Sequence, residues 1–307
     1  MTERSPRRRH DRELFYKYMK FDTAKIVLTT RRVRWKTPLE FNDMFDVPRE
    51  IDLGFTPEQA RDALTERFVR LIEQPDLIDP SWNPRLKLML DMVKKGTSEK
   101  RKSLVEHLRR AVPEMGQEML DRMRTGLEEV KVFWRNRLPE LRVFCLSETN
   151  SNEVMWTHYA ENNRGAVLEF RCIDELDSYF LLAEKVEYLD SLPPIATAVN
   201  AAECFVSGRK LFEPKELYDK YLHTKKAKWE YEQEWRIFTF ADDDDTGSYT
   251  DMKFNPQELA AIYVGAAMSA QNVEEVKRLL VGDFAHVRLH KCVPDYEGRQ
   301  LKFEPVV

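Results

Sequence analysis

Acidic and aromatic side chains are densest between Trp229 and Arg236, where the chain reads WEYEQEWR. If this segment is an extended strand, Glu232, Glu234 and Arg236 share one face, because strand residues two apart point the same way. Two carboxylates roughly 6–7 Å apart on one face repel each other unless a cation or a ligand lies between them, and Arg236 is a candidate for that cation. The alternative is a ladder of ion pairs on a solvated face, which composition alone favours. Against a loose strand stand the aromatic residues expected on the opposite face, Trp229, Tyr231 and Trp235.

A second pattern joins Ser147 and Glu148 to the sequence MWTHY that ends at Tyr159. Ser147 and Glu148 follow an expected strand and precede an expected helix, and loops of this kind commonly carry binding groups. Trp156 and Tyr159 lie three positions apart and therefore share a helix face. His158 points away from that face, and a lone histidine is more often a structural hydrogen-bond donor than a catalyst. The segment is therefore a candidate binding loop.

Two further segments place polar and aromatic groups near the start of the chain. Asn42 and Asp43 favour a tight turn, from which either side chain can reach a ligand. In the sequence FYKY, strand alternation puts Tyr16 and Tyr18 on one face and Lys17 on the other. Tyrosines within a sheet usually pack against neighbours, and the alternative is a stacking platform for a planar ring.

Several common classes of site lack their motifs in this sequence. There is no GxGxxG, GxxxxGK[ST], HExxH or GxSxG, which argues against standard dinucleotide folds, P-loop enzymes, zincins and α/β-hydrolases. The four cysteines are far apart and form no CxxC pair, so that we expect no zinc site, no disulfide and a reducing, cytoplasmic compartment. The four adjacent aspartates at 242–245 could bind a cation, although such a run is usually a solvated turn. We expect no bound metal.

The elements that position these residues predict an α+β fold. Residues 56–138 contain consecutive helical patterns, and the first begins with Thr56-Pro57-Glu58-Gln59, a capping box with proline at the first helical position. We therefore predict a mixed β-sheet core from residues 11–55 and 139–307, with a large helical insertion at 56–138. Strands are expected at 14–18, 31–35, 142–146, 166–172, 185–189, 232–240, 261–264 and 286–292, and further helices at 151–163, 216–228 and 272–280.

Composition places the chain among globular proteins, with 307 residues of which 42% are hydrophobic and 33% charged. A formal net charge of -4 gives no overall basic field that would recruit nucleic acid. No apolar run reaches the ~18 residues that a membrane span needs. The polar, basic segment 1–10 lacks the apolar stretch of a secretory signal, and we expect it to be a disordered tail.

Together, the four segments resemble the bacterial family called domain of unknown function 2971. The pattern of that family runs Y-[KHR]-Y, then F-N-D-P-F, then S-E with M-W-x-H-Y, then W-x-Y-E-x-E-[WR]-R. This chain repeats the pattern in the same order between about Leu14 and Leu280. It departs at Met44, where the family usually has proline, a change that alters the loop but removes no functional group.

The layout of the family is similar to that of ADP-ribosyltransferases, which implies a split β-sheet, NAD as the substrate, and a role as a toxin or phage-defence effector. By this resemblance, Glu234 stabilises the positive charge that develops on the ribose, and Glu232 orients or activates the acceptor. Lys17 takes the first-strand position, and Tyr16 or Tyr18 stacks on nicotinamide. The other implied NAD contacts are Asn42 and His158 for the ribose or diphosphate, Arg236 for phosphate or for orienting Glu234, and Asp43, Ser147, Trp156 and Tyr159 around them.

Two other functions remain open on the sequence. One is a ligand-binding or sensor module of a defence system without catalysis. The other is a metal-dependent hydrolase or nuclease that uses Glu148, Glu232 and Glu234, for which the acidic run at 242–245 is the supporting feature. The acceptor of a transferase could be protein, DNA, RNA or water. The helical insertion could be a partner-docking surface, a self-association surface or a lid, and no membrane partner is expected.

Overall fold

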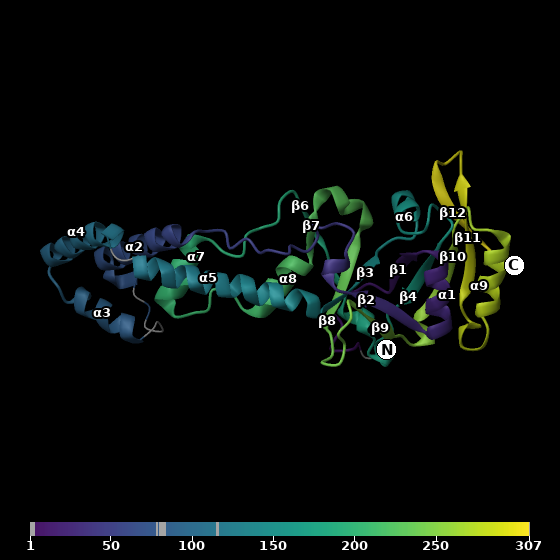
Figure 1. Cartoon of the computed structure of the whole chain (residues 1–307), viewed down its shortest axis with the longest axis horizontal. Helices are drawn as coiled ribbons and strands as arrows, with labels where there is room; N and C mark the ends of the chain where they lie inside the picture. Colours follow the sequence, from purple (N-terminus) through teal and green to yellow (C-terminus); the bar gives the residue numbers. More distant parts are fainter. Residues whose placement is uncertain (1–3, 78, 80–83, 115–116, 307) are drawn as a thin grey trace. The chain divides into compact units, whose positions relative to one another are not determined.

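A computed structural model describes the chain except for residues 1–3, 78, 80–83, 115–116 and 307, and the chain divides into two compact units. The core unit consists of Met1–Val47, Leu138–Leu192 and Tyr221–Val307. The helical unit consists of Pro48–Arg137 and Pro193–Lys220. Helices and a mixed sheet occur together (Figure 1), which confirms the predicted α+β class.

A mixed sheet forms most of the core unit. Among the described residues it has ten strands, eight of which follow the order β12-β11-β10-β4-β1-β3-β2-β9, while β8 pairs with β3 and β5. Strands β10 and β11 are parallel, and the other pairs of this sheet are antiparallel. The strands are β1 (Leu14–Met19), β2 (Arg32–Lys36), β3 (Leu141–Ser147), β4 (Ala166–Arg171), β5 (Glu184–Lys185), β8 (Glu234–Phe240), β9 (Tyr249–Lys253), β10 (Leu259–Val264), β11 (Arg288–Asp295) and β12 (Gln300–Pro305).

The two faces of this sheet have different roles. On one face, alternate residues such as Phe15 and Leu146 join the main hydrophobic core, together with α1 (Phe21–Thr30) and α9 (Ala270–Leu279), which lie near each other in Figure 1. On the other face, α6 (Glu153–His158) buries Trp156 against Tyr18 and Val167. Cross-strand partners point to the same face of a sheet, so this second face also carries a transverse row of polar side chains. That row is formed by Glu169, Tyr16, Ser147 and Glu234 on β4, β1, β3 and β8.

The sheet is split on one side of β3. Strand β1 pairs with β3 only at Tyr16 and Ser147, and β2 pairs with it only at Lys36 and Val143. The side chain of Lys17 lies beside this split, where Nζ donates to the carbonyl oxygen of Cys145 at 2.5 Å. Burial lowers the pKa of Lys17. Lys17 thus gives a backbone acceptor of β3 a partner that the neighbouring strand does not supply.

The helical unit is larger than the predicted insertion. Thr56 and Gln59 form the expected capping box at the start of α2, with hydrogen bonds of 3.2 and 2.8 Å. Residues 193–220 belong to this unit and not to the core, where we predicted them. The reason is that the apolar side of α7 packs against α2, where Leu64 and Leu71 meet Val206. The helices concerned are α2 (Pro57–Glu73), α3 (Pro84–Lys94), α4 (Ser98–Glu114), α5 (Gln117–Arg137), α7 (Ala198–Ser207) and the first part of α8 (Pro214–Leu222). No helix within the described residues is both long enough and apolar enough to cross a membrane.

Residues 4–10 differ from the disordered tail that we expected for 1–10; residues 1–3 lie outside the described part of the chain. The side chain of Arg8 is only 4% exposed, and it forms two hydrogen bonds of 2.9 Å with Asp174. His10 bonds to the carbonyl oxygen of Phe180 at 2.9 Å. The basic residues of this segment are therefore ion-pair partners of the core unit, which the segment's charge alone did not reveal.

Candidate functional site

A turn, rather than a continuous strand, positions the two glutamates of the WEYEQEWR segment. Residues Ala227–Glu232 form a 3-10 helix, Gln233 adopts the left-handed conformation with φ 44°, and β8 begins only at Glu234. The expected strand over 232–240 is therefore wrong at its start, and Trp229 and Tyr231 do not cover the back of a strand. The expected helix at 216–228 also ends early, at Leu222, and is followed by the short strand β7 (Thr224–Lys226), which pairs with β6 (Glu187–Leu189).

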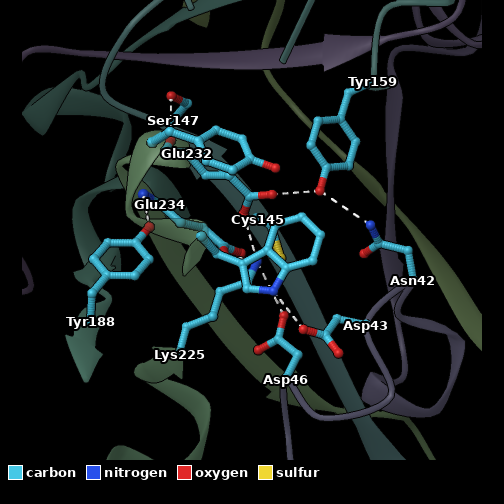
Figure 2. Close-up of polar contacts among 12 residues, drawn as sticks. Asn42, Asp43, Asp46, Cys145, Ser147, Tyr159, Tyr188, Lys225, Glu232 and Glu234 are labelled. Atoms are coloured by element: carbon cyan, nitrogen blue, oxygen red, sulfur yellow. Dashed lines mark hydrogen bonds and ion pairs between the residues drawn. The ribbon is translucent and has the colours of Figure 1, made fainter. Parts of the chain in front are cut away.

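Glu232 and Glu234 nevertheless converge, because both bind Lys225. The distances from Lys225 Nζ are 2.5 Å to Glu232 Oε2, 2.9 Å to Glu234 Oε2 and 3.3 Å to Asp46 Oδ2. Arg236 completes the group: it donates to both oxygens of Glu234 at 2.9 Å and to both oxygens of Asp46 at 2.7 Å. We call these five residues the buried charge cluster, since none is more than 4% exposed. It holds three carboxylates and two cations. Figure 2 labels four of its members, Asp46, Lys225, Glu232 and Glu234.

The pKa values of the two glutamates in the cluster are shifted in opposite directions. Burial opposes the charge of Glu234, but Arg236 and Lys225 outweigh this effect and hold its pKa well below the usual range. For Glu232, burial raises the pKa, and the neighbouring Glu234 adds to this effect although Lys225 opposes it. Glu234 is thus a fixed anion, while Glu232 is the carboxylate whose protonation is easier to change.

A chain of hydrogen bonds connects Glu232 to the surface of the core unit. Its Oε1 accepts from the hydroxyl of Tyr159 at 2.5 Å, and this hydroxyl in turn accepts from the exposed amide of Asn42 at 3.2 Å (Figure 2). The backbone is held as well: Ser147 Oγ donates to the Glu232 carbonyl at 2.8 Å, and the N–H of Glu234 donates to Tyr188 Oη at 2.7 Å. Burial, together with the charge of Glu232, raises the pKa of Tyr159, so its hydroxyl remains a donor to this carboxylate.

Aromatic rings surround the outer end of this chain. The ring centroids of Trp229 and Tyr231 are 5.9 Å apart, and His158 lies 6.5 Å from Tyr231 and 6.4 Å from Tyr159. We call these four residues the aromatic rim. The indole N–H of Trp229 donates to Asp43 at 2.5 Å, and Lys225 Nζ lies 5.1 Å from the centre of the Trp229 ring. A cation beneath one face of an aromatic ring is stabilised by it, which ties the rim to the buried cluster.

The structure brings together eight of the twelve predicted site residues. Asn42, Asp43, Ser147, His158, Tyr159, Glu232, Glu234 and Arg236 belong to the cluster, its backbone supports or its rim.

The other four predicted residues have different surroundings. Tyr18 donates to the Thr149 carbonyl at 3.0 Å, and Trp156 is fully buried with its indole N–H on the Asn150 carbonyl at 2.7 Å. Both therefore fix the loop before α6. The ring of Tyr16 contacts Tyr263, and Lys17 lies on the opposite face of the sheet.

Sequence reasoning missed Asp46, Lys225 and Tyr188. One signal was available in the sequence. Glu232, Glu234 and Arg236 together carry one net negative charge, and burying them requires a second cation close by. The sequence offers Lys225, Lys226 and Lys228 near the motif, and nothing in their pattern distinguishes the buried one. The role of Asp46 depends on a contact with Arg236 across 190 positions, which no local pattern encodes.

Of the three carboxylates proposed for metal-dependent hydrolysis, Glu148 does not join Glu232 and Glu234. Glu148 accepts from the indole N–H of Trp235 at 2.7 Å and pairs with Lys185 at 2.9 Å. Trp235 points into the main core, on the face of β8 opposite to Glu234. Within the described part of the chain, Glu148, Glu232 and Glu234 form no group with metal-ligand spacing. In the acidic run, Asp245 bonds to Thr250 and lies 3.6 Å from Arg142, which is the pattern of a structural turn.

Comparison with known protein families identifies one segment of the chain. Residues 155–237 match the family model described as Protein of unknown function (DUF2971), which supports the resemblance over this segment. The match runs from α6 to β8, so that it includes Tyr159, Lys225, Glu232, Glu234 and Arg236. A search of curated proteins and a search of solved structures gave no match.

Proposed function

We propose that this chain cleaves the bond between nicotinamide and ribose in NAD and transfers the ADP-ribose to an acceptor, as ADP-ribosyltransferases do. The observation that carries the proposal is the contact set of Glu232: one carboxylate oxygen binds Lys225 inside the cluster, and the other binds Tyr159 at its outer end. Glu232 therefore presents its Oε1, the oxygen bonded to Tyr159, on the side of the aromatic rim.

Charge supports this chemistry. With every group ionised, three carboxylates and two cations leave the cluster with one net negative charge. Breaking the nicotinamide–ribose bond builds positive charge on the ribose, as glycoside chemistry does generally. A fixed negative charge in a water-poor site stabilises such a transition state more than it stabilises the substrate.

The contacts favour different roles for the two glutamates from those that the resemblance implied. Glu234 is fully buried, and its two oxygens are already bonded to Arg236 and Lys225. It is a positioning residue in this proposal. A carboxylate oxygen accepts more than one hydrogen bond, so Glu232 Oε1 can accept from a ribose hydroxyl beside Tyr159. Glu232 is therefore the proposed catalytic residue.

The aromatic rim suits the leaving group. Nicotinamide in NAD is a planar cation, and the faces of tryptophan and tyrosine attract such cations. Trp229 and Tyr231 are half-buried, so part of each ring is open to a ligand. Tyr16 and Tyr18, to which stacking was first assigned, are engaged elsewhere in the core unit.

The test is to incubate the protein with NAD, with and without cell extract, and to follow free nicotinamide. We expect release by the wild type, unchanged by a chelator, and a loss of about a hundredfold or more in Glu232→Gln. The matched control is Glu169→Gln, because Glu169 is equally buried and is likewise bonded to a tyrosine and a basic side chain. Absence of release by the wild type under both conditions contradicts the proposal, as does equal loss in both variants.

The complete pairing of Glu234 favours a second candidate, a module that binds NAD, or another ligand with a planar cationic ring, without cleaving it. In that case calorimetry would detect binding of NAD by the wild type while nicotinamide release stayed at background. Glu232→Gln would then weaken binding without any effect on turnover.

A further inference from the structure

A strip of basic residues lies on the sheet face that carries the buried charge cluster. Strand β2 alternates buried Val33 and Trp35 with the exposed residues Arg32, Arg34 and Lys36. Lys36 pairs with Val143 of β3, which shares a face with Cys145 and Ser147, the cross-strand partners of Arg236 and Glu234. The exposed side of β2 is therefore a continuation of the site face.

Strand β9 widens the strip. Arg32 pairs with Lys253, and Lys36 pairs with Tyr249, so both ends of β9 carry an exposed side chain on the same face. We call Arg32, Arg34, Lys36, Tyr249 and Lys253 the basic strip. It contains four cations, and the carboxylate between them is that of Asp251, which leaves a formal charge of +3 on a chain whose net charge is -4.

The strip contains a fixed part and a free part. Arg34 bonds both oxygens of Asp251 at 2.9 and 3.0 Å, and its guanidinium lies 3.5 Å from the centre of the Tyr249 ring. This stack holds Tyr249 in place, while the residue as a whole is 42% exposed. Arg32 donates to a backbone carbonyl, and no carboxylate among the described residues forms an ion pair with Arg32, Lys36 or Lys253. The three unpaired cations are available to an external anion.

We propose that the basic strip binds a single-stranded nucleic acid, with Arg32, Lys36 and Lys253 on backbone phosphates and Tyr249 stacked on a base. A positively charged groove or face with an aromatic ring is the combination that holds single strands without reading their sequence. The aspartates at 242–244 are exposed in the loop before β9. The N–H of Thr37 donates to the carbonyl oxygen of Ser248 at the end of that loop, so these aspartates mark the limit of the strip next to Lys36.

The position of the strip gives this proposal a functional meaning, which rests on the proposed transferase activity. From Lys36 to Glu234 there are two strand spacings across the sheet and four residues along β3, which is roughly 17 Å. A single strand that keeps the rise of about 3.4 Å per nucleotide found in a duplex covers this distance with about five nucleotides. A strand bound on the strip can therefore span the distance to the buried charge cluster, and nucleic acid is the acceptor class that this proximity favours over protein or water.

Binding is measured directly, by fluorescence anisotropy with labelled 20-nucleotide single strands of RNA and of DNA and without NAD. Three phosphate contacts predict that the logarithm of the affinity falls with the logarithm of salt concentration with a slope of about -2. The test variant is the triple change Arg32→Glu, Lys36→Glu and Lys253→Glu, for which we expect more than a tenfold loss of affinity. Tyr249→Ala should lose about tenfold through the missing stack, with little change in the salt slope.

The matched control changes the same number of charges at the other end of the core unit. Arg278→Glu, Lys291→Glu and Lys302→Glu lie in α9, β11 and β12, and all three residues are exposed. This variant should keep the wild-type affinity within about twofold, and a melting curve by circular dichroism verifies that both triple variants fold. Absence of binding, equal losses in the two triple variants, or binding only to vesicles that contain anionic lipid would overturn the proposal. Because no NAD is present, strand binding without nicotinamide release supports the strip and refutes only the transferase activity.

Discussion

Two buried glutamates of the core unit, Glu169 and Glu232, show how differently a buried carboxylate can be stabilised. Glu169 accepts from Tyr263 at 2.6 Å and from Arg288 at 2.8 Å, and the side chain of Arg288 is 59% exposed. Glu232 accepts from Tyr159 and Lys225, both at 2.5 Å, but the Lys225 side chain is 4% exposed and also binds two other acids. Both glutamates have a tyrosine and a cation as partners. The two groups differ in their cation. Water can take the place of Arg288 beside Glu169, whereas Lys225 is buried from water and is shared by three acids.

This difference implies that one residue of the Glu169 group can be substituted at little cost in stability, whereas one residue of the buried charge cluster cannot. A pair with a solvated member contributes little, typically under about 1 kcal/mol, because solvent screens the attraction. In a buried network, each charge is a partner of several others, and removal of one leaves its neighbours without compensation. The cluster is therefore the more fragile of the two regions, and it is the region that we assign to function.

The largest contrast should come from the two arginines. Arg236→Met leaves Glu234 and Asp46 with Lys225 as their common cation, and we expect a loss of about 3–5 kcal/mol in the free energy of unfolding. Arg288→Met should cost about 1 kcal/mol or less, because solvent reaches the vacated position. Urea denaturation at neutral pH measures both variants. Equal losses would show that the two groups are stabilised in the same way.

A smaller effect, with a distinctive dependence on pH, is expected from Glu234→Gln. Its depressed pKa means that the charged form of Glu234 contributes stability above the unfolded value of 4.5, and that this contribution is lost as the pH falls through the folded value. The wild type should therefore exceed the variant by about 2–3 kcal/mol at pH 7, and the gap should narrow steadily below pH 4.5. Denaturation midpoints between pH 7 and the lowest pH at which both proteins fold test this, and a gap independent of pH contradicts it.

The smallest difference in stability between the two groups should come from the paired hydroxyl deletions Tyr159→Phe and Tyr263→Phe. Each removes one hydrogen bond to a glutamate, so both should lose a similar 1–2 kcal/mol, or about one bond to a charged group. Activity separates them: nicotinamide release should fall about tenfold in Tyr159→Phe, where Glu232 loses its orientation, and stay unchanged in Tyr263→Phe. Equal activities in the two variants would remove Tyr159 from the proposed site.

The sequence was informative where local chemistry determines structure. The capping box at Thr56 predicts the start of α2 because cap and helix are made by the same four residues. The apolar run AIYV at 261–264 predicts a strand because it is short and is followed by glycine, and β10 buries all of its residues. The grouping of Asn42, Tyr159 and Glu232 was predicted only from a resemblance to a family pattern, since no single segment contains the contacts that join them.

The sequence was misleading where a distant contact overrides local pattern. Alternation of Glu232, Glu234 and Arg236 predicts one strand face, yet the left-handed Gln233 ends a 3-10 helix between the two glutamates. Lys225 outweighs the repulsion between them, so the strand is not needed to bring them together. Similarly, α7 follows a long stretch of the core unit in sequence, and only its packing against α2 shows to which unit it belongs.

The split beside β3 has a consequence for motion within the core unit. Two isolated backbone bridges, one to β1 and one to β2, join β3 to its neighbours on that side, whereas β8 is paired with it along its whole length on the other. Amide protons exchange with solvent through local openings, and these are easiest where few backbone bonds must break together. Local opening of the sheet, measured as exchange of amide protons, should thus begin at the split between β1 and β3 beside Lys17, and not at the outer strands.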